Sequence, residues 1–192
     1  RVMRDGAIAY VCMDWRHMRE LMDAGAQVFA ELKNLCVWTK SNGGMGSLYR
    51  SQHELVFVFK KGGDAHVNNV ELGRFGRNRT NVWTYAGANA FKQGRDDELA
   101  MHPTVKPVAL VEDAIKDVSN RGGLVLDPFG GSGSTLIAAD RCGRSARLIE
   151  IDPLYCDVII RRFETFTGKR ATLAETSQTF EDVAAARLAA VA

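Results

Sequence analysis

The sequence predicts an α/β fold in which helices cover both faces of a doubly wound, mostly parallel sheet. Short apolar segments of strand character alternate with segments whose apolar residues recur at helical spacing, as in 108–119 and 153–166. The strand expected at 124–127 runs into a glycine-rich turn, and this turn opens a further helix. Alternation of this kind is typical of a parallel sheet that is buried on both faces.

Strands and helices are expected in a regular order along the chain. We expect strands at residues 6–13, 35–40, 55–60, 124–127 and 146–151, and helices at residues 15–22, 108–119, 153–166 and from 136 onward. Gly25 and Gly168 are expected to end the helices before them, because glycine favours the position just past a helix. Asp152 with Pro153 is typical of a helix start. From residue 171 the chain becomes polar and then alanine-rich, which indicates a surface helix or a frayed terminus.

Composition indicates one soluble domain. The chain has 192 residues, of which 46% are hydrophobic, enough to bury a single core. No apolar run approaches the roughly 18 residues that span a bilayer, and no signal-peptide pattern opens the chain. The cysteines lie far apart, without the spacing of a zinc site or a disulfide framework: Cys12, Cys36, Cys142 and Cys156. We therefore expect a cytoplasmic protein with reduced thiols, no bound metal and no membrane contact.

The turn at residues 127–135 is the main candidate for a binding site. A tight backbone beside a helix N-terminus can receive a nucleotide or a carboxylate. Glu150 follows about twenty residues later, at the end of the next strand, where an acid suits a ribose diol. A phosphate-binding P-loop does not fit, because Ser134 stands where that loop has lysine. A dinucleotide-binding turn does not fit either, because Leu136 stands where its third glycine belongs.

The remaining class of turn carries an acid and an aromatic residue directly before its glycines. Residues 127–135, Asp-Pro-Phe-Gly-Gly-Ser-Gly-Ser-Thr, resemble the first motif of the S-adenosylmethionine-dependent methyltransferases that modify DNA amino groups. The resemblance implies a Rossmann-like fold. It also implies that Asp127 lies near the methionine end of the cofactor, that Glu150 binds the ribose hydroxyls, and that the amides of Gly131 and Gly133 are approachable.

A second segment resembles the same family. Residues 102–107, His-Pro-Thr-Val-Lys-Pro, match the H-P-T-x-K-P element that precedes the glycine motif there and lines the methionine side of the pocket. Lys106 is therefore expected beside the methionine carboxylate; a proline-rich helix entry with a solvated lysine is the alternative. The cofactor-binding residues implied by the resemblance are His102, Thr104, Lys106, Asp127, Phe129, Gly131, Ser132, Gly133 and Glu150.

Two segments before residue 61 resemble parts of the family that flank the target base. Trp38-Thr39-Lys40 matches its W-x-K segment and Ser51-Gln52-His53-Glu54 its S-x-H-E segment, and the glycines between them indicate a mobile loop. A purely structural pair at a strand entry is an equally good interpretation of His53 and Glu54.

Residues 62–100 lack periodicity and mix cations, amides and aromatic side chains. From Lys60 to Arg95 the chain has seven basic and two acidic residues, a local net charge of +5. Such a segment can contact phosphates and base edges, and Trp83 or Phe75 can stack or wedge between bases. In the resembled family this stretch recognises the target; a long solvated loop is the alternative. The expected DNA-binding residues are Lys40, Asn42, Arg50, Ser51, His53, Arg74, Arg77 and Arg79.

One expected element is missing from the chain. The family transfers the methyl group with a [DNS]-P-P-[YFW] tetrapeptide, and none occurs in these 192 residues. Residues 152–155 lack the second proline, and we interpret them as a helix start. We therefore assign no catalytic residue and expect the motif upstream of Arg1. The expected organisation is part of the catalytic half at 1–61, target recognition at 62–101, a cofactor-binding half at 102–170 and a tail at 171–192.

The sequence therefore predicts a β-type methyltransferase. We expect it to move a methyl group from S-adenosylmethionine to a base amine of double-stranded DNA, adenine N6 in preference to cytosine N4. The implied setting is a bacterial or phage one, and a homodimer and a companion restriction nuclease are open partners. Two other interpretations stay open: an inactive remnant that binds cofactor or DNA, and a methyltransferase of RNA or small molecules. A dehydrogenase fits the glycine pattern least well.

Overall fold

The computed structural model describes residues 2–46, 48–76, 78–87 and 105–190. The strands are β1 (Ile8–Met13), β2 (Glu31–Thr39), β3 (His53–Lys60), β4 (Val82–Thr84), β5 (Leu124–Asp127) and β6 (Ser145–Leu148). The helices are α1 (Met18–Val28), α3 (Val108–Val118), α4 (Ser134–Arg141), α5 (Pro153–Thr167) and α6 (Phe180–Ala189), with short 3₁₀ helices η1 (Trp15–His17) and η2 (Arg74–Gly76). None of the helices in these ranges is long and apolar enough to cross a membrane.

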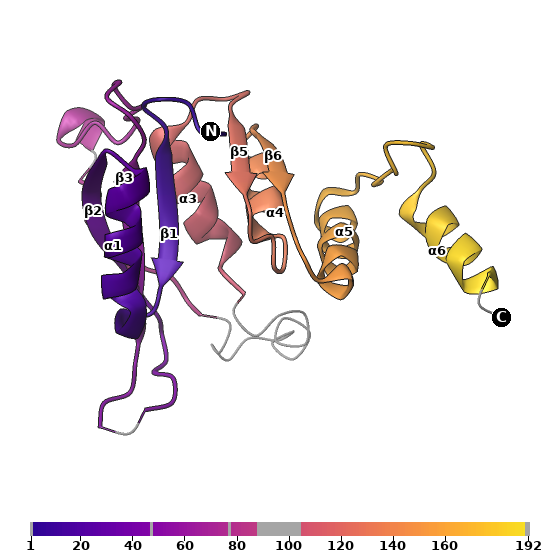
Figure 1. The fold of residues 1–192 in the computed structure, drawn as a ribbon, viewed down its shortest axis with the longest axis horizontal. Helices are drawn as coiled ribbons and strands as arrows, with labels where there is room; N and C mark the ends of the chain where they lie inside the picture. The colour runs from indigo at the N-terminus through magenta and orange to yellow at the C-terminus, as the bar shows by residue number, and fades with distance from the viewer. Residues whose placement is uncertain (1, 47, 77, 88–104, 191–192) are drawn as a thin grey trace.

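The strands form two sheets (Figure 1). The larger sheet has the order β1-β3-β2-β4, and the smaller one pairs β5 with β6 in parallel. A hairpin joins β2 to β3, which makes this pair antiparallel, and β3 is also antiparallel to β1. Strands β1 and β2 run in the same direction because both are antiparallel to β3, and β4 shares this direction because it pairs in parallel with β2. The expected α/β fold with mostly parallel strands is confirmed, and β3 is the strand that runs the other way.

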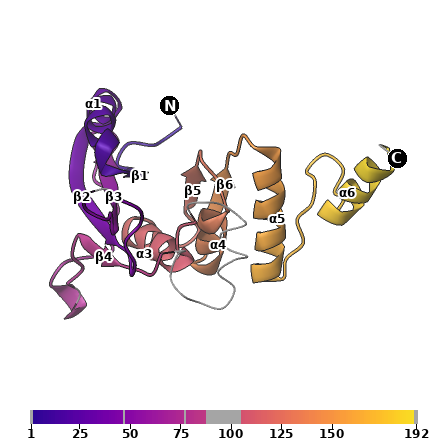
Figure 2. The ribbon, with the colours of Figure 1, turned by 90° about the horizontal axis from the view of Figure 1, so that it is seen from below.

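Helix α3 lies between the two sheets and packs on both (Figure 2). One of its faces buries Leu110 and Ala114 against Val56 and Trp38 of the larger sheet. Its other face buries Ile115 against the alanines of α4 and the β5–β6 side. The opposite face of the larger sheet is covered by α1, whose apolar residues pack with the phenylalanines of β3. The apolar residues whose periodicity predicted α3 thus pack into two separate hydrophobic cores.

The first helix runs further than expected. After η1, helix α1 continues through Gly25 to Val28, so the prediction that Gly25 ends the helix is wrong. Gly25 is buried where the helix crosses β3, and a Cβ atom at this position would lie 2.5 Å from the ring of Phe59. The glycine allows close packing of helix and sheet, which in sequence cannot be distinguished from a helix stop.

Strand boundaries also differ from the expected ones. Strand β2 begins at Glu31 rather than at residue 35. The sequence did not reveal its first residues, because an irregular register between Leu32 and Asn34 interrupts the alternation of side chains that marks a strand. Strand β6 ends at Leu148, so Glu150 lies beyond the strand and not at its last position. Asp152 does cap α5, and Gly168 ends it in a left-handed conformation, as predicted.

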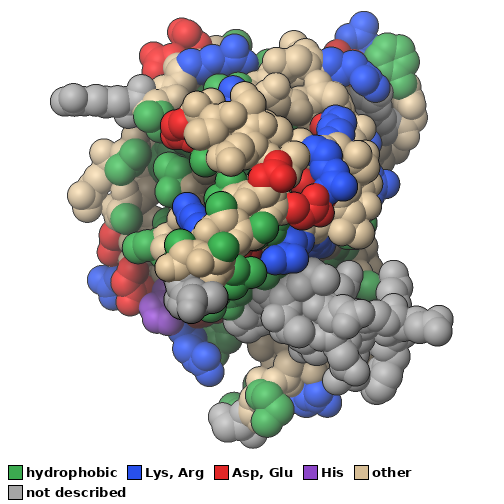
Figure 3. Space-filling view, turned by 90° about the vertical axis from the view of Figure 1, so that its right-hand side faces the viewer, with side chains coloured by type: hydrophobic (Ala, Val, Ile, Leu, Met, Phe, Trp, Pro, Cys, Tyr) green, Lys and Arg blue, Asp and Glu red, His purple; other side chains and the backbone are tan. Residues whose placement is uncertain are grey.

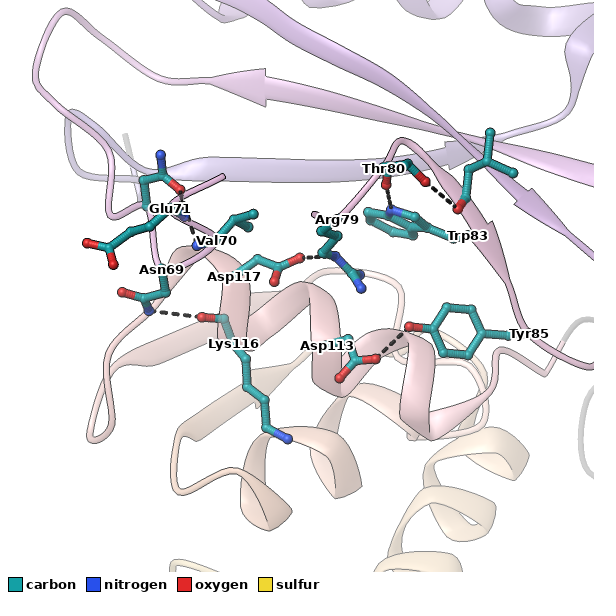
Figure 4. Close-up of polar contacts among 12 residues, drawn as sticks. Asn69, Val70, Glu71, Arg79, Thr80, Trp83, Tyr85, Asp113, Lys116 and Asp117 are labelled. Carbon is teal, nitrogen blue, oxygen red and sulfur yellow. Dashed lines mark hydrogen bonds and ion pairs between the residues drawn. The ribbon is translucent and has the colours of Figure 1, made fainter. Parts of the chain in front are cut away.

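The basic segment after β3 is less loop-like than the sequence indicated. It contains β4, in which Trp83 is only 5% exposed. Of the two aromatic residues expected to stack or wedge between bases, Trp83 is therefore buried, whereas Phe75 is 74% exposed. Side chains of the segment attach it to α3 at both ends (Figure 4). The amide nitrogen of Asn69 donates to the Lys116 carbonyl at 2.9 Å, and the Tyr85 hydroxyl donates to Asp113 at 2.5 Å.

Arg79 is the central member of this attachment (Figure 4). Its Nε atom lies 2.6 Å from an Asp117 carboxylate oxygen on α3, and its guanidinium lies 4.9 Å from the centre of the Trp83 ring. Both members of the ion pair are largely buried, with 25% and 17% of their side chains exposed. The positive charge of Arg79 is therefore paired with Asp117 inside the protein. Arg79 was expected to contact DNA, and we do not propose it as a DNA contact.

Replacing Arg79 by methionine tests this attachment, because it retains much of the apolar stem but leaves Asp117 without its cation. We expect the free energy of unfolding, measured by urea denaturation, to fall by about 2 kcal/mol. Arg74→Met is the matched control, because Arg74 forms an exposed pair with Glu71 and its loss should change stability by less than about 0.5 kcal/mol. Equal losses in the two variants would contradict the role given to Arg79.

Candidate active site

The glycine turn joins the end of β5 to the start of α4. Its shape is fixed by backbone hydrogen bonds: Gly133 N–H donates to the Gly130 carbonyl at 2.9 Å, and Gly130 N–H donates to the Ile149 carbonyl at 2.9 Å. Gly133 has a φ of 77°, in the left-handed region that favours glycine. The Asp127 carboxylate accepts from Phe129 N–H at 3.0 Å and from the Thr135 hydroxyl at 2.6 Å. The acid that precedes the turn therefore also closes it.

Glu150 lies opposite the turn, just beyond β6. Its Oε2 atom accepts from Gly131 N–H at 2.6 Å, and its Oε1 atom accepts from the amides of Ile151 and Asp152 at 2.9 and 3.1 Å. Three amides thus fix the orientation of this carboxylate.

Asp127, the glycine turn and Glu150 line one cavity of about 580 Å³. Lys106 and Thr135 lie on its wall together with the apolar side chains of Val111, Phe129, Ile149 and Ile151. Phe129 and Ile151 are 85% and 96% exposed, which leaves apolar surface for a flat ring. A site of this volume, with a few oriented polar groups and an apolar rim, is typical of cofactor binding. Of the residues expected there, His102 and Thr104 lie outside the described part of the chain.

Arg162 on α5 binds the glycine turn, a role that was not predicted from the sequence. The sequence does not distinguish Arg162 from its neighbour Arg161, yet Arg162 is only 7% exposed. Its guanidinium donates to the Ser132 carbonyl at 2.9 Å and to the Ser132 and Ser134 hydroxyls at 3.1 Å. Its position relative to Tyr155 and Ile159 puts it on the inward stripe of the helix, which is the signal that could have identified it.

Lys106 connects the cavity to the larger sheet. Its Nζ atom lies 3.2 Å from a carboxylate oxygen of Glu54, and the other oxygen of Glu54 lies 3.2 Å from Nζ of Lys40. Lys40 also lies over the Trp38 ring, 4.6 Å from its centre. Glu54 is therefore shared between two lysines at the point where the segments 1–61 and 105–190 meet.

The surroundings of Lys106 keep it charged. Burial alone would lower its pKa, but Cys12, Glu54 and Asp127 raise the pKa by favouring the ammonium form. Burial raises the pKa of the Cys12 thiol to about 11, although Lys106 opposes this shift. Cys12 is thus a neutral thiol at neutral pH, and the two carboxylates are the groups that hold the lysine cation.

The residues expected to bind DNA divide into two groups. Lys40 pairs with Glu54, and Arg79 pairs with Asp117, so both have partners inside the protein. The others lie in or beside the β2–β3 hairpin or in η2: Asn42, Arg50, Ser51, His53 and Arg74. Arg77 lies outside the described residues.

The face formed by α5 and α6 has no single-sign patch; its acidic and basic side chains are intermixed (Figure 3). Several of them pair with each other, including Lys169 with Asp140 and Arg170 with Glu181. Among the described residues of α5 and α6, positive charge is therefore not gathered into one surface.

Comparison with known proteins agrees with this geometry. The DNA methylase family model N6_N4_Mtase matches residues 1–161. The type II methyltransferase M.HpaI of Haemophilus parainfluenzae is 26% identical over 183 residues, which are 88% of this chain and 57% of the relative. M.ScaI of Streptomyces caespitosus is 35% identical over 50% of this chain and 31% of its own length. The DNA adenine methyltransferase YhdJ of Escherichia coli is 39% identical over 44% of this chain and 27% of its own length.

Solved structures have the same fold. The TTHA0409 putative DNA modification methylase from Thermus thermophilus, in complex with S-adenosyl-L-methionine, has a TM-score of 0.65 at 22% identity, over 88% of this chain and 73% of that one. The cytosine-N4-specific PvuII DNA methyltransferase has a TM-score of 0.67 at 19% identity, over 84% of this chain and 65% of that one. These likenesses confirm the Rossmann-like α/β fold.

The chain spans about a third to three fifths of the length of M.ScaI and M.HpaI. The family model nevertheless covers both sheets, the glycine turn, Glu150 and the start of α5. The chain therefore belongs to the N6/N4 DNA methylase family.

Proposed function

We propose that this chain forms the S-adenosylmethionine pocket and part of the DNA-contacting surface of a methyltransferase that modifies adenine N6 in double-stranded DNA. The observation that carries the proposal is the cavity between the glycine turn and Glu150, at the ends of two parallel strands. Crevices at the carboxyl ends of parallel strands are where open α/β sheets bind their ligands.

The residues of the cavity fit this cofactor. Glu150 would bind the ribose hydroxyls, because it lines the cavity and three amides fix the orientation of its carboxylate. Lys106 would pair with the methionine carboxylate, and Asp127 would face the ammonium group at the same end. Phe129 would contribute its exposed ring to the apolar wall. Gly130, Gly131 and Ser132 lie on the same wall. We propose that the cofactor packs against the backbone of this wall, because the amides of Gly130 and Gly131 already donate to Ile149 and Glu150.

When bound, S-adenosylmethionine supplies a methyl group on a sulfonium sulfur, which is a good leaving group without further activation. The contribution of the protein is then to position and orient the reacting groups. Lys106 is suited to this task because Glu54 holds its ammonium group at the wall of the cavity. The same carboxylate binds Lys40 at the neck of the β2–β3 hairpin, which connects the cofactor side to the side where a flipped base would enter.

We assign the proton acceptor for the base amine to none of residues 1–192, because their sequence contains no [DNS]-P-P-[YFW] tetrapeptide. We propose that a [DNS]-P-P-[YFW] element outside these residues provides it. Among the described residues, β1 and β5 each have a strand partner on one side only, and both edges lie beside α3 (Figure 1). A strand added between them would end beside the cavity, where Asp127 ends β5.

Adenine is proposed over cytosine because YhdJ, a DNA adenine methyltransferase, is 39% identical where it matches this chain. PvuII, which is cytosine-N4-specific, matches at 19% identity. The type II names of M.HpaI and M.ScaI support a companion restriction nuclease as a further proposal. We also propose that the enzyme acts in the cytoplasm, where its DNA is.

Transfer of labelled methyl groups tests the activity. The chain and a longer form with the sequence encoded upstream of Arg1 are incubated with methyl-labelled S-adenosylmethionine and unmethylated genomic DNA, and the DNA is hydrolysed to nucleosides. We expect label in N6-methyladenine with the longer form only. Label with the chain alone would contradict the proposal that the proton acceptor lies outside residues 1–192. Label in N4-methylcytosine would contradict the proposal that adenine is the substrate base. No label with either form would favour an inactive remnant.

Arg162→Gln tests the support of the glycine turn, because it removes a buried cation from the two serines that flank Gly133. We expect S-adenosylmethionine binding, measured by calorimetry below the unfolding temperature, to weaken by about tenfold, since charge-assisted hydrogen bonds that shape the pocket are lost. Arg161→Gln is the matched control, because Arg161 is exposed and its variant should bind S-adenosylmethionine like the wild type. Unchanged affinity in Arg162→Gln would contradict a role of Arg162 in binding.

A further inference from the structure

The hairpin between β2 and β3, residues 41–52, projects from the end of the larger sheet (Figure 1). Its neck is closed by two bonds between Lys40 and Gln52: the Lys40 N–H donates to the Gln52 carbonyl at 2.9 Å, and the Gln52 amide donates to the Lys40 carbonyl at 2.8 Å. Lys40 and Glu54 at this neck lead directly to Lys106 on the cavity wall. The hairpin therefore extends from the same edge as the proposed cofactor pocket.

Internal contacts shape the hairpin beyond its neck. The Arg50 guanidinium donates to the Gly44 carbonyl at 3.0 Å and to the Gly43 carbonyl at 2.6 Å, and so crosses from one arm to the other. A Cβ atom at Gly46 would lie 2.2 Å from the Tyr49 carbonyl oxygen, so only glycine allows the tip to close this tightly. The described residues on the two arms, 43–46 and 49–50, are thus held together before any partner arrives.

The tip presents apolar side chains to solvent. Met45, Leu48 and Tyr49 are 96%, 83% and 85% exposed. Three large apolar side chains at the end of a braced hairpin are typical of a contact surface rather than of scattered surface residues. Of the two aromatic residues expected to stack or wedge between bases, Trp83 is buried within β4 and Phe75 is exposed in η2.

The charge of the hairpin indicates the kind of partner. Residues 41–52 contain one basic residue, Arg50, and no acidic one. The nearest acid in sequence, Glu54, is paired with two lysines. Apolar side chains beside a cation, with no acidic residue among them, suit a partner that has flat apolar surfaces and negative charge. DNA has both, because its stacked bases are flat and its phosphate backbone is anionic.

We propose that the tip of hairpin 41–52 is a wedge that enters the base stack of duplex DNA beside the base to be methylated. The Tyr49 ring stacks on a base, while Met45 and Leu48 occupy the space that the displaced base leaves. Enzymes that modify a base must take it out of the stack, and apolar side chains inserted at a base step offset part of the unstacking energy. This inference rests on the proposed function, because it requires DNA as substrate.

The test compares binding of the purified chain to two labelled duplexes by fluorescence anisotropy, one fully paired and one with a single abasic site. The wild type should prefer the abasic duplex, since no base has to be displaced there. Tyr49→Ala should bind the abasic duplex about tenfold more weakly and the paired duplex by a smaller factor, so that the preference is lost, while Tyr49→Phe should keep the wild-type affinity and preference. The salt dependence of Tyr49→Ala should equal that of the wild type, because no phosphate contact is removed.

Leu72→Ala is the matched control, because Leu72 is 70% exposed but lies in the segment after β3 and not in the hairpin. Wild-type affinity and preference in Tyr49→Ala would overturn the wedge and leave the DNA proposal intact. A shallower salt dependence in that variant would also overturn the wedge, since it would indicate a lost phosphate contact. A wild-type chain that binds S-adenosylmethionine but neither duplex would overturn both the wedge and the DNA-contacting role.

Discussion

The structure depends on the burial of α3 between two sheets. Leu110 and Ala114 on one side and Ile115 on the other fix the larger sheet relative to β5 and β6. Lys106 stands just before this helix, so the same packing sets the distance between the cofactor cavity and Glu54. The basic segment is fastened to α3 as well, through Asp113 and Asp117. Burial of one two-sided helix thus positions the cavity, the segment and the hairpin neck together.

Charge is used differently in the interior and at the surface of this protein. Arg162 and Arg79 are held by serines and by Asp117, and each fixes a segment that has little regular structure of its own. Buried cations with fitted partners define one arrangement of the backbone, because any other arrangement would leave a charge without compensation. At the surface, the hairpin uses Arg50 to hold its two arms together and leaves Met45, Leu48 and Tyr49 exposed. Interior arginines therefore hold the site in place, and exposed groups are left to contact the substrate.

The glycine turn, Asp127, Glu150 and the helices on either side could be predicted because local backbone chemistry determines them. Residues 127–135 need little tertiary context to form a tight turn, and α3 and α5 were visible as helical periodicity. The sequence could not show which cations are buried: Arg162 and Arg79 look like their exposed neighbours until the partner element is in place. Gly25 and Trp83 were misinterpreted for the same reason, because their contacts come from strands that are distant in sequence. Tertiary packing, not local propensity, decided these positions.

The central claim is that the cavity between the glycine turn and Glu150 takes S-adenosylmethionine. Titration calorimetry of the chain with S-adenosylmethionine, and separately with NAD, tests it most directly because it does not depend on methyl transfer or on DNA. The account predicts saturable, one-to-one binding of S-adenosylmethionine, lost in a variant such as Glu150→Lys, and no binding of NAD at the same concentrations. Binding of NAD without S-adenosylmethionine would contradict the claim and favour a dinucleotide-dependent enzyme.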